Sequence, residues 1–222
     1  QKKILNRLFP GYVITEEANP ETVSGIIYPE EDVFIKKAVL KRKNDFKSGR
    51  LCAKKALAKL GIERFPIKIA NDRSPIWPDG IVGSIAHTQG YCGVAVAVKR
   101  NVKSLGLDIE CVDRLKSNCR YLVCTEDEMA AINARPKSIQ DKLAAFIFSA
   151  KECFYKCQFT INRCWAGFHD AKISLDIDIN NEGDFEIILL KDIGRYFTKG
   201  SSFKGKYIFN QRYVLTGMTI EN

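Results

Sequence analysis

The nine residues Phe148–Lys156, which read FSAKECFYK, decide how the second half of this chain folds. They lie inside the apolar-rich segment 139–159, which contains neither Gly nor Pro and therefore predicts a long buried helix. On a helix, residues three and four apart share a face, so Lys151, Glu152 and Lys156 are expected on one side. Charged groups on an otherwise apolar helix are costly unless each has a partner. An exposed i,i+4 pair between Glu152 and Lys156 would meet that requirement without any functional site.

A second stretch, Ser104–Val112 (SLGLDIECV), alternates between apolar and other residues as a strand does. Gly106, Asp108 and Glu110 fall on one face of this strand, and the glycine leaves space beside the two carboxylates. Carboxylates this close repel each other unless a cation lies between them. A hard divalent ion such as Mg²⁺ takes one or two protein carboxylates and completes its shell with water and substrate phosphates.

The two stretches together favour a site over their separate structural explanations. For the D-x-E strand alone, the simpler interpretation is an exposed acidic edge of a half-solvated sheet. The K-E-x-x-x-K helix changes this balance, because Glu152 could supply a third carboxylate. Lys151 and Lys156 could in turn hold the negative charge of a phosphate.

These two motifs resemble the paired signature of the 4′-phosphopantetheinyl transferases. The resemblance rests on Gly106–Glu110 and on Phe148–Glu152 followed by Lys156, and the interval between the motifs also fits that family. The match is to the larger type that serves siderophore and nonribosomal peptide synthetases, represented by Sfp and the enterobactin-synthetase enzyme.

Two further stretches agree with this family. Residues 73–80 followed by 83–87 resemble its Pro-Trp-Pro and Gly-Ser-Ile-x-His segment, and residues 42–57 resemble its N-terminal arginine helix. The resemblance implies that five side chains from these stretches bind coenzyme A: Arg42, Arg50, Arg73, Ser84 and His87. Of these, Arg42 and Arg50 are the implied ligands of the nucleotide 3′-phosphate, since a guanidinium can form paired bonds to phosphate oxygens.

The chemistry follows from the same resemblance. It implies coenzyme A as the substrate, a serine of an acyl, peptidyl or aryl carrier domain as the acceptor, and adenosine 3′,5′-bisphosphate as the leaving group. It places Mg²⁺, or Mn²⁺ in its stead, on Asp108, Glu110 and Glu152. The implied catalytic set is Glu152, Lys151, Asp108 and Lys156, and the two lysines would also contact coenzyme A. Whether Glu152 is mainly a metal ligand or the general base that deprotonates the serine stays open.

Composition limits the alternatives without choosing among them. The 222 residues carry a net charge of +9, which suits acidic partners such as nucleic acid, a polyphosphate ligand or an acidic protein. A basic nucleic-acid-binding module would interleave aromatic residues with Lys and Arg on one face, whereas the aromatic residues here follow apolar patterns. Because of this aromatic pattern, no nucleic acid is expected as a partner. A carboxylate–Mg phosphoesterase is a further alternative, which would use similar carboxylates but would release its product to water.

The remaining features predict a cytoplasmic protein. No apolar run reaches the length of a membrane span, and no signal-peptide pattern is present. The eight cysteines include no C-x-x-C pair, which favours reduced thiols over a zinc site or a disulfide framework.

The fold is expected to be α+β, with antiparallel strands packed on long helices. A helix over 45–60 precedes a meander of three strands that ends with the Asp108 strand, and four more strands follow the long helix, over 173–179, 185–191, 207–209 and 213–220. We expect two subdomains, 1–104 and 105–222. The resemblance implies that these are similar α/β halves related by a pseudo-twofold axis, which makes a monomer the default.

Overall fold

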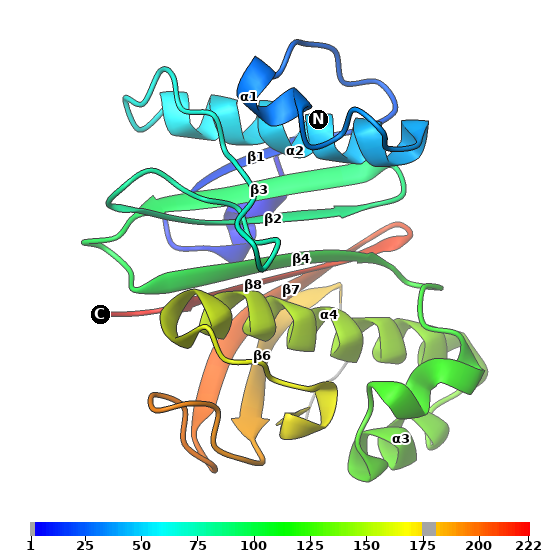
Figure 1. Ribbon diagram of the computed structural model, residues 1–222. Helices are drawn as coiled ribbons and strands as arrows, with labels where there is room; N and C mark the ends of the chain where they lie inside the picture. The colour runs from blue at the N-terminus through cyan, green and yellow to red at the C-terminus, as the bar shows by residue number, and fades with distance from the viewer. Residues whose placement is uncertain (1–2, 175–180) are drawn as a thin grey trace.

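The computed structural model describes residues 3–174 and 181–222, and these form an α+β fold (Figure 1). The helices are η1 (Leu5–Leu8), α1 (Pro29–Asp32), α2 (Leu40–Ala58), η2 (Ser117–Leu122), α3 (Glu126–Asn133), α4 (Lys137–Asn162) and η3 (Phe168–Asp170). The strands are β1 (Ile14–Ala18), β2 (Ile81–Thr88), β3 (Tyr91–Val98), β4 (Ser104–Cys111), β5 (Ala171–Ile173), β6 (Glu182–Leu189), β7 (Ser202–Asn210) and β8 (Tyr213–Ile220).

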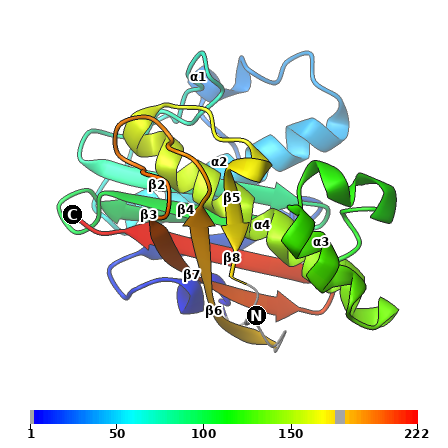
Figure 2. The same cartoon turned by 90° about the horizontal axis from the view of Figure 1, so that it is seen from below.

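The strands form two antiparallel sheets. The first has the order β1-β3-β2, and the second has the order β4-β8-β7-β6-β5. Helix α2 covers the first sheet and α4 lies along the second, as Figures 1 and 2 show. The prediction of antiparallel strands packed on long helices is therefore confirmed.

Three apolar clusters account for this arrangement. Small and branched residues of α2, among them Ala53, Ala56 and Leu57, pack on Val94 and Val96 of β3. A second cluster fills the space between the two sheets and is made by Val82, Ala86, Ala95, Leu105, Leu107, Ile109 and Leu215, with Leu5 and Leu8 of η1. The third lies between α4 and the second sheet and includes Phe146, Phe154, Phe185 and Ile187. The burial of these apolar surfaces against each other is the main term that stabilises the layers.

The predicted three-strand meander is wrong at its third strand. β2 and β3 pair as expected, but β4 pairs with β8, where Asp108 lies opposite Thr216. Residues 99–103 thus carry the chain from one sheet to the other. β4 has both faces buried, with Leu107 in the core between the sheets and Gly106 against α4, so alternation alone did not identify its neighbour.

Gly106 fixes how closely α4 approaches β4. A Cβ atom at this position would lie 2.1 Å from the carbonyl oxygen of Cys153. Only glycine allows this approach, because any side chain here would push the helix away from the strand. The sequence predicts that Gly106 leaves space beside the carboxylates, but the backbone of α4 at Cys153 fills that position.

Other element boundaries differ in detail. α2 begins at Leu40 and not at residue 45, so Arg42 lies in its first turn, and it ends at Ala58, close to the predicted end at residue 60. α4 extends the predicted segment 139–159 at both ends. The predicted strand over 173–179 lies largely outside the described residues. The strand over 185–191 overlaps β6, the strand over 207–209 is part of β7, and the strand over 213–220 coincides with β8.

Candidate functional site

The acidic face of β4 points toward α4, where Asp108 meets Lys156. Asp108 is only 4% exposed, and its Oδ1 accepts a hydrogen bond of 2.7 Å from Lys156 Nζ. The same ammonium donates to the carbonyl oxygen of Leu107 at 3.2 Å. Burial alone would lower the pKa of Lys156, but the Asp108 carboxylate outweighs this and holds that pKa above its usual range.

The second oxygen of Asp108 is the unusual one. Oδ2 is buried and has no hydrogen-bond partner among the described residues. Leaving a buried charged oxygen unpaired costs more than a typical hydrogen bond contributes, so native proteins rarely do this without a function. An unpaired carboxylate oxygen of this kind is suited to bind a cation directly.

Glu110 and Glu152 share this electrostatic environment. Burial raises the pKa of Glu110 to about 7, and the nearby Asp108 charge adds to the rise, against a weaker opposite effect of Arg114 at 3.7 Å. Burial also raises the pKa of Glu152, which Lys156 partly opposes. A carboxyl with a raised pKa can take up a proton near neutral pH. Within residues 3–174 and 181–222, however, no three His, Cys, Asp or Glu side chains are grouped so as to hold a metal ion.

Lys151 lies apart from these carboxylates. Its Nζ donates to Glu128 Oε2 at 2.7 Å and to the carbonyl oxygens of Val123 and Phe168 at 2.9 and 2.8 Å. An ammonium has three donors, so these three bonds use all of them. The structure therefore brings Lys156 but not Lys151 to Asp108, although both lie on the same helix.

The partner of Lys151 was not recognised as such from the sequence. Glu128 is fully buried; its Oε2 also accepts from the Thr125 amide at 2.7 Å, and its Oε1 accepts from the Ile173 amide at 2.8 Å. Thr125 and Glu128 form a capping box at the start of α3, but the T-x-x-E pattern of such a box does not indicate that its glutamate is buried. Here it joins α3, α4 and β5 beside the site.

Besides the two lysines, five residues are predicted to bind coenzyme A, and four of these five line one cavity of about 140 Å³: Arg42, Arg50, Arg73 and His87. They come from α2, from the loop after Ile69 and from β2, so only the tertiary fold brings them together. Arg73 has a left-handed backbone with a φ of 69°. His87 Nδ1 lies 3.9 Å from Asp45 Oδ2, and burial lowers the pKa of the ring despite this carboxylate.

Ser84, the fifth predicted residue, joins the two sheets. Its Oγ accepts from the Leu107 amide at 3.1 Å and lies 3.4 Å from the Leu107 carbonyl oxygen. It also lines a cavity of about 280 Å³ together with Arg73 and Lys156. Next to it, the Trp77 ring occupies the space that a Cβ on Gly83 would need, which explains why glycine stands in this segment.

The cavities adjoin one another. Arg73 borders both the 280 Å³ and the 140 Å³ cavities, and His87 borders the latter and a third of about 400 Å³ that reaches Glu110 and Arg114. By these shared residues the arginine-lined cavity lies between the cavity of Lys156 and the cavity of Glu110. Cationic side chains border all three cavities, and such a surface suits a molecule that carries several phosphates.

Comparison with known proteins identifies the family. Residues 30–97 match the 4′-phosphopantetheinyl transferase N-terminal domain, and residues 104–216 match the 4′-phosphopantetheinyl transferase superfamily. The 4′-phosphopantetheinyl transferase Svp of Streptomyces mobaraensis is 31% identical over 96% of this chain and 87% of its own. PptT of Mycobacterium tuberculosis is 37% identical over 68% of this chain and 66% of its own, and enterobactin synthase component D of Salmonella typhi is 32% identical over 63% and 58%.

The chain therefore belongs to the 4′-phosphopantetheinyl transferases, in the larger type predicted from its motifs. It transfers the 4′-phosphopantetheine moiety of coenzyme A to carrier proteins. The comparisons support neither a nucleic-acid-binding module nor a phosphoesterase. Among the described helices, none is long and apolar enough to cross a membrane.

Proposed function

We propose that coenzyme A lies along the linked cavities, with its pyrophosphate beside Asp108 and Lys156. The observation that carries this assignment is the buried, unpaired Oδ2 of Asp108 next to the Lys156 ammonium. At the other end, Arg42, Arg50, Arg73 and His87 receive the adenosine 3′-phosphate, and Ser84 borders the path between the two ends.

We further propose that Asp108, Glu110 and Glu152 are the residues that would hold Mg²⁺ or Mn²⁺. The support is the unpaired Asp108 oxygen and the raised pKa of Glu110, which burial causes first and the Asp108 charge second. In the described residues the three carboxylates are not yet grouped around one point, so binding an ion would require their side chains to move together. When bound, the ion neutralises charge on the pyrophosphate while the phosphoryl group is transferred.

In the transfer, the carrier serine hydroxyl attacks the β-phosphorus, which is joined to pantetheine. The bond to the bridging oxygen of the pyrophosphate breaks, and adenosine 3′,5′-bisphosphate leaves with the electron pair. Glu152 accepts the serine proton, directly or through a water, because its raised pKa suits a general base. Lys156 offsets the negative charge on the phosphate oxygens.

Lys151 takes a different role in this proposal. Because its three donors hold Glu128, Val123 and Phe168, it supports the segment beside Glu152 and does not contact phosphate. The catalytic set is then Glu152, Asp108 and Lys156, with Lys151 behind them.

The partner is an acyl, peptidyl or aryl carrier domain of a nonribosomal peptide, siderophore or polyketide synthetase. We propose that units 1–104 and 105–222, related by a pseudo-twofold axis, enclose the substrate between them in a monomer. All eight cysteines are free, which supports work in the reducing cytoplasm.

The test measures the mass of an apo carrier domain after incubation with the protein, coenzyme A and Mg²⁺. A mass gain equal to phosphopantetheine is expected for the wild type. Asp108→Ala and Glu152→Gln should each nearly abolish this gain while circular dichroism stays unchanged. Near-normal turnover in either folded variant would refute the assignment of the acidic face.

The nucleotide end has its own test. Arg50→Ala should weaken binding of coenzyme A far more than binding of 3′-dephospho-coenzyme A in calorimetry. A charged hydrogen bond to phosphate is worth about 1.5–3 kcal/mol, which is roughly tenfold or more in affinity. Equal losses for both ligands would contradict a 3′-phosphate contact of Arg50.

A further inference from the structure

Arg50 is held in place before any ligand arrives. Its side chain is only 7% exposed, and the guanidinium carbon lies 4.2 Å from the centre of the Phe46 ring. The Nε–H donates to the carbonyl oxygen of Ile67 at 2.9 Å. Since Nε is committed to the backbone, the two Nη groups remain for a ligand in the cavity that Arg50 lines.

The backbone of Ile67, whose carbonyl oxygen anchors Arg50, is itself held by Glu31. This carboxylate belongs to α1, is only 2% exposed, and accepts from the Ile67 amide at 2.8 Å through Oε1. Its other oxygen accepts from the Tyr28 amide at 3.0 Å. Glu31 Oε1 also lies 4.0 Å from Arg50 Nε, so both partners of this ion pair bind the backbone of one residue, Glu31 at its N–H and Arg50 at its carbonyl oxygen.

Burying this carboxylate is costly for the fold. A buried ion pair rarely adds to stability compared with apolar residues of similar volume, because both charges lose their hydration. What the pair supplies is geometry, since a guanidinium whose Nε edge is fixed presents its other edge in one orientation. The edge that is oriented in this way faces the cavity that Arg50 lines, so a ligand in that cavity would benefit from the orientation.

We infer that Glu31 is a positioning residue that sets the discrimination of this enzyme between coenzyme A and 3′-dephospho-coenzyme A, by orienting Arg50 through Ile67. The inference rests on the proposed contact between Arg50 and the 3′-phosphate. Glu31 touches neither the substrate nor the reacting atoms, and nothing in the sequence around Pro29–Asp32 marked it as part of the site.

The test is a double-mutant cycle of Glu31→Gln and Arg50→Ala, with dissociation constants measured by calorimetry. The quantity compared is the ratio of the Kd of 3′-dephospho-coenzyme A to the Kd of coenzyme A. Glutamine keeps the volume but has one carbonyl oxygen for two backbone N–H donors, so it cannot hold both Ile67 and Tyr28. In the wild-type background, Glu31→Gln should lower the ratio several-fold, up to about tenfold, through weaker binding of coenzyme A alone. In the Arg50→Ala background it should leave the ratio unchanged, because the orientation no longer matters.

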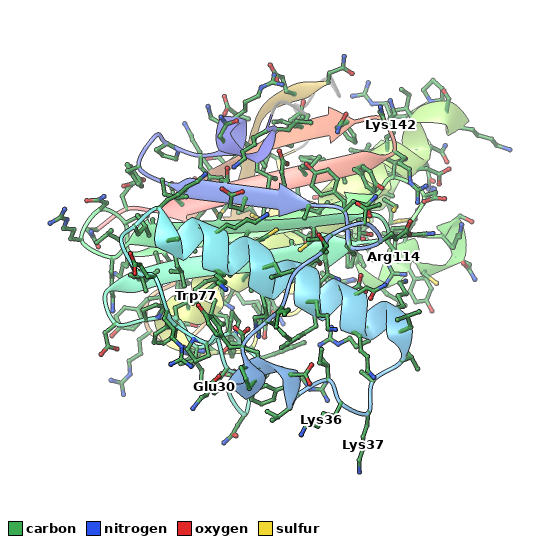
Figure 3. The ribbon with its side chains drawn as sticks, turned by 90° about the horizontal axis from the view of Figure 1, so that it is seen from above. Glu30, Lys36, Lys37, Trp77, Arg114 and Lys142 are labelled. Carbon is green, nitrogen blue, oxygen red and sulfur yellow. The ribbon has the colours of Figure 1, made fainter. Side chains whose placement is uncertain are left out.

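Glu30→Gln is the matched control. Glu30 lies in the same helix beside α2, where Figure 3 labels it, but pairs with the exposed Arg64 at 3.1 Å. The ratio should not change in this variant. Should Glu31→Gln fail to fold, Glu31→Asp keeps the charge while withdrawing the oxygens from Ile67, and the same fall in ratio is expected.

The possible results distinguish the positioning role of Glu31 from the proposed contact between Arg50 and the 3′-phosphate. If Arg50→Ala changes the ratio but neither Glu31 variant does, the positioning role is refuted and the phosphate contact stands. A rise of the ratio in Glu31→Gln would show that the carboxylate competes for Arg50, which also overturns the inference. If Arg50→Ala itself leaves the ratio unchanged, the proposed 3′-phosphate contact fails.

Discussion

Glu110→Gln should stabilise the protein at alkaline pH and leave it nearly unaffected at acid pH. The carboxyl has its pKa raised from 4.5 to about 7, first by burial and then by the Asp108 charge. The folded state thus prefers the protonated form. The favourable contribution is complete below about pH 4.5 and is lost as the pH rises through about 7.

The size follows from the pKa difference. Each unit corresponds to 1.36 kcal/mol, so a rise of roughly two to three units makes the ionised form about 3 kcal/mol less favourable in the folded state. The side chain of Glu110 is 14% exposed, so little of this is screened by solvent. For a chain of this length, about 3 kcal/mol corresponds to a shift in Tm of roughly 6–12 °C.

The assay is thermal unfolding of both proteins at about pH 5 and about pH 8.5 in the presence of a chelator. The quantity to compare is the difference in Tm between variant and wild type, because this difference cancels the other titrating groups, His87 included. Parallel behaviour of the two proteins across this range would refute the electrostatic description of Glu110. If Mg²⁺ binds at these carboxylates, adding it at alkaline pH should raise the Tm of the wild type more than that of the variant.

Three further predictions concern the rest of the site. Lys151→Met and Glu128→Gln should each destabilise the protein by about 3–5 kcal/mol in urea unfolding, because each leaves a buried charge unpaired, whereas the double variant should lose less than the sum. If Lys151 contacts no phosphate, the folded double variant should keep measurable turnover; complete loss would return Lys151 to the catalytic set. Gly106→Ala should lower the free energy of unfolding by about 1–3 kcal/mol or more and should lower turnover, because its Cβ would lie 2.1 Å from the Cys153 carbonyl oxygen. A variant with the Tm of the wild type would contradict this packing. With coenzyme A saturating, kcat/KM for an acidic carrier should fall steeply with added salt while kcat changes little; indifference to salt would indicate mainly apolar docking.

The sequence was sufficient for features that depend on near neighbours. The apolar run around Phe148–Lys156 predicted α4, because helix hydrogen bonds join residues four apart and the apolar face repeats with them. Alternation placed Gly106, Asp108 and Glu110 on one face of a strand, and that face does meet α4. The residues of the motifs, with their spacing, carried the resemblance to the family that the comparisons confirm.

The tertiary structure decided which groups meet. Lys151 and Lys156 are equivalent by their positions on one helix, but in the fold Lys151 pairs with Glu128 and Lys156 pairs with Asp108. β4 joined β8, which lies about a hundred residues away, and Arg50 was anchored by Glu31 through Ile67. Such pairings depend on which surfaces are buried together and on the charges that must be neutralised there, and these are properties of distant segments that no local pattern contains.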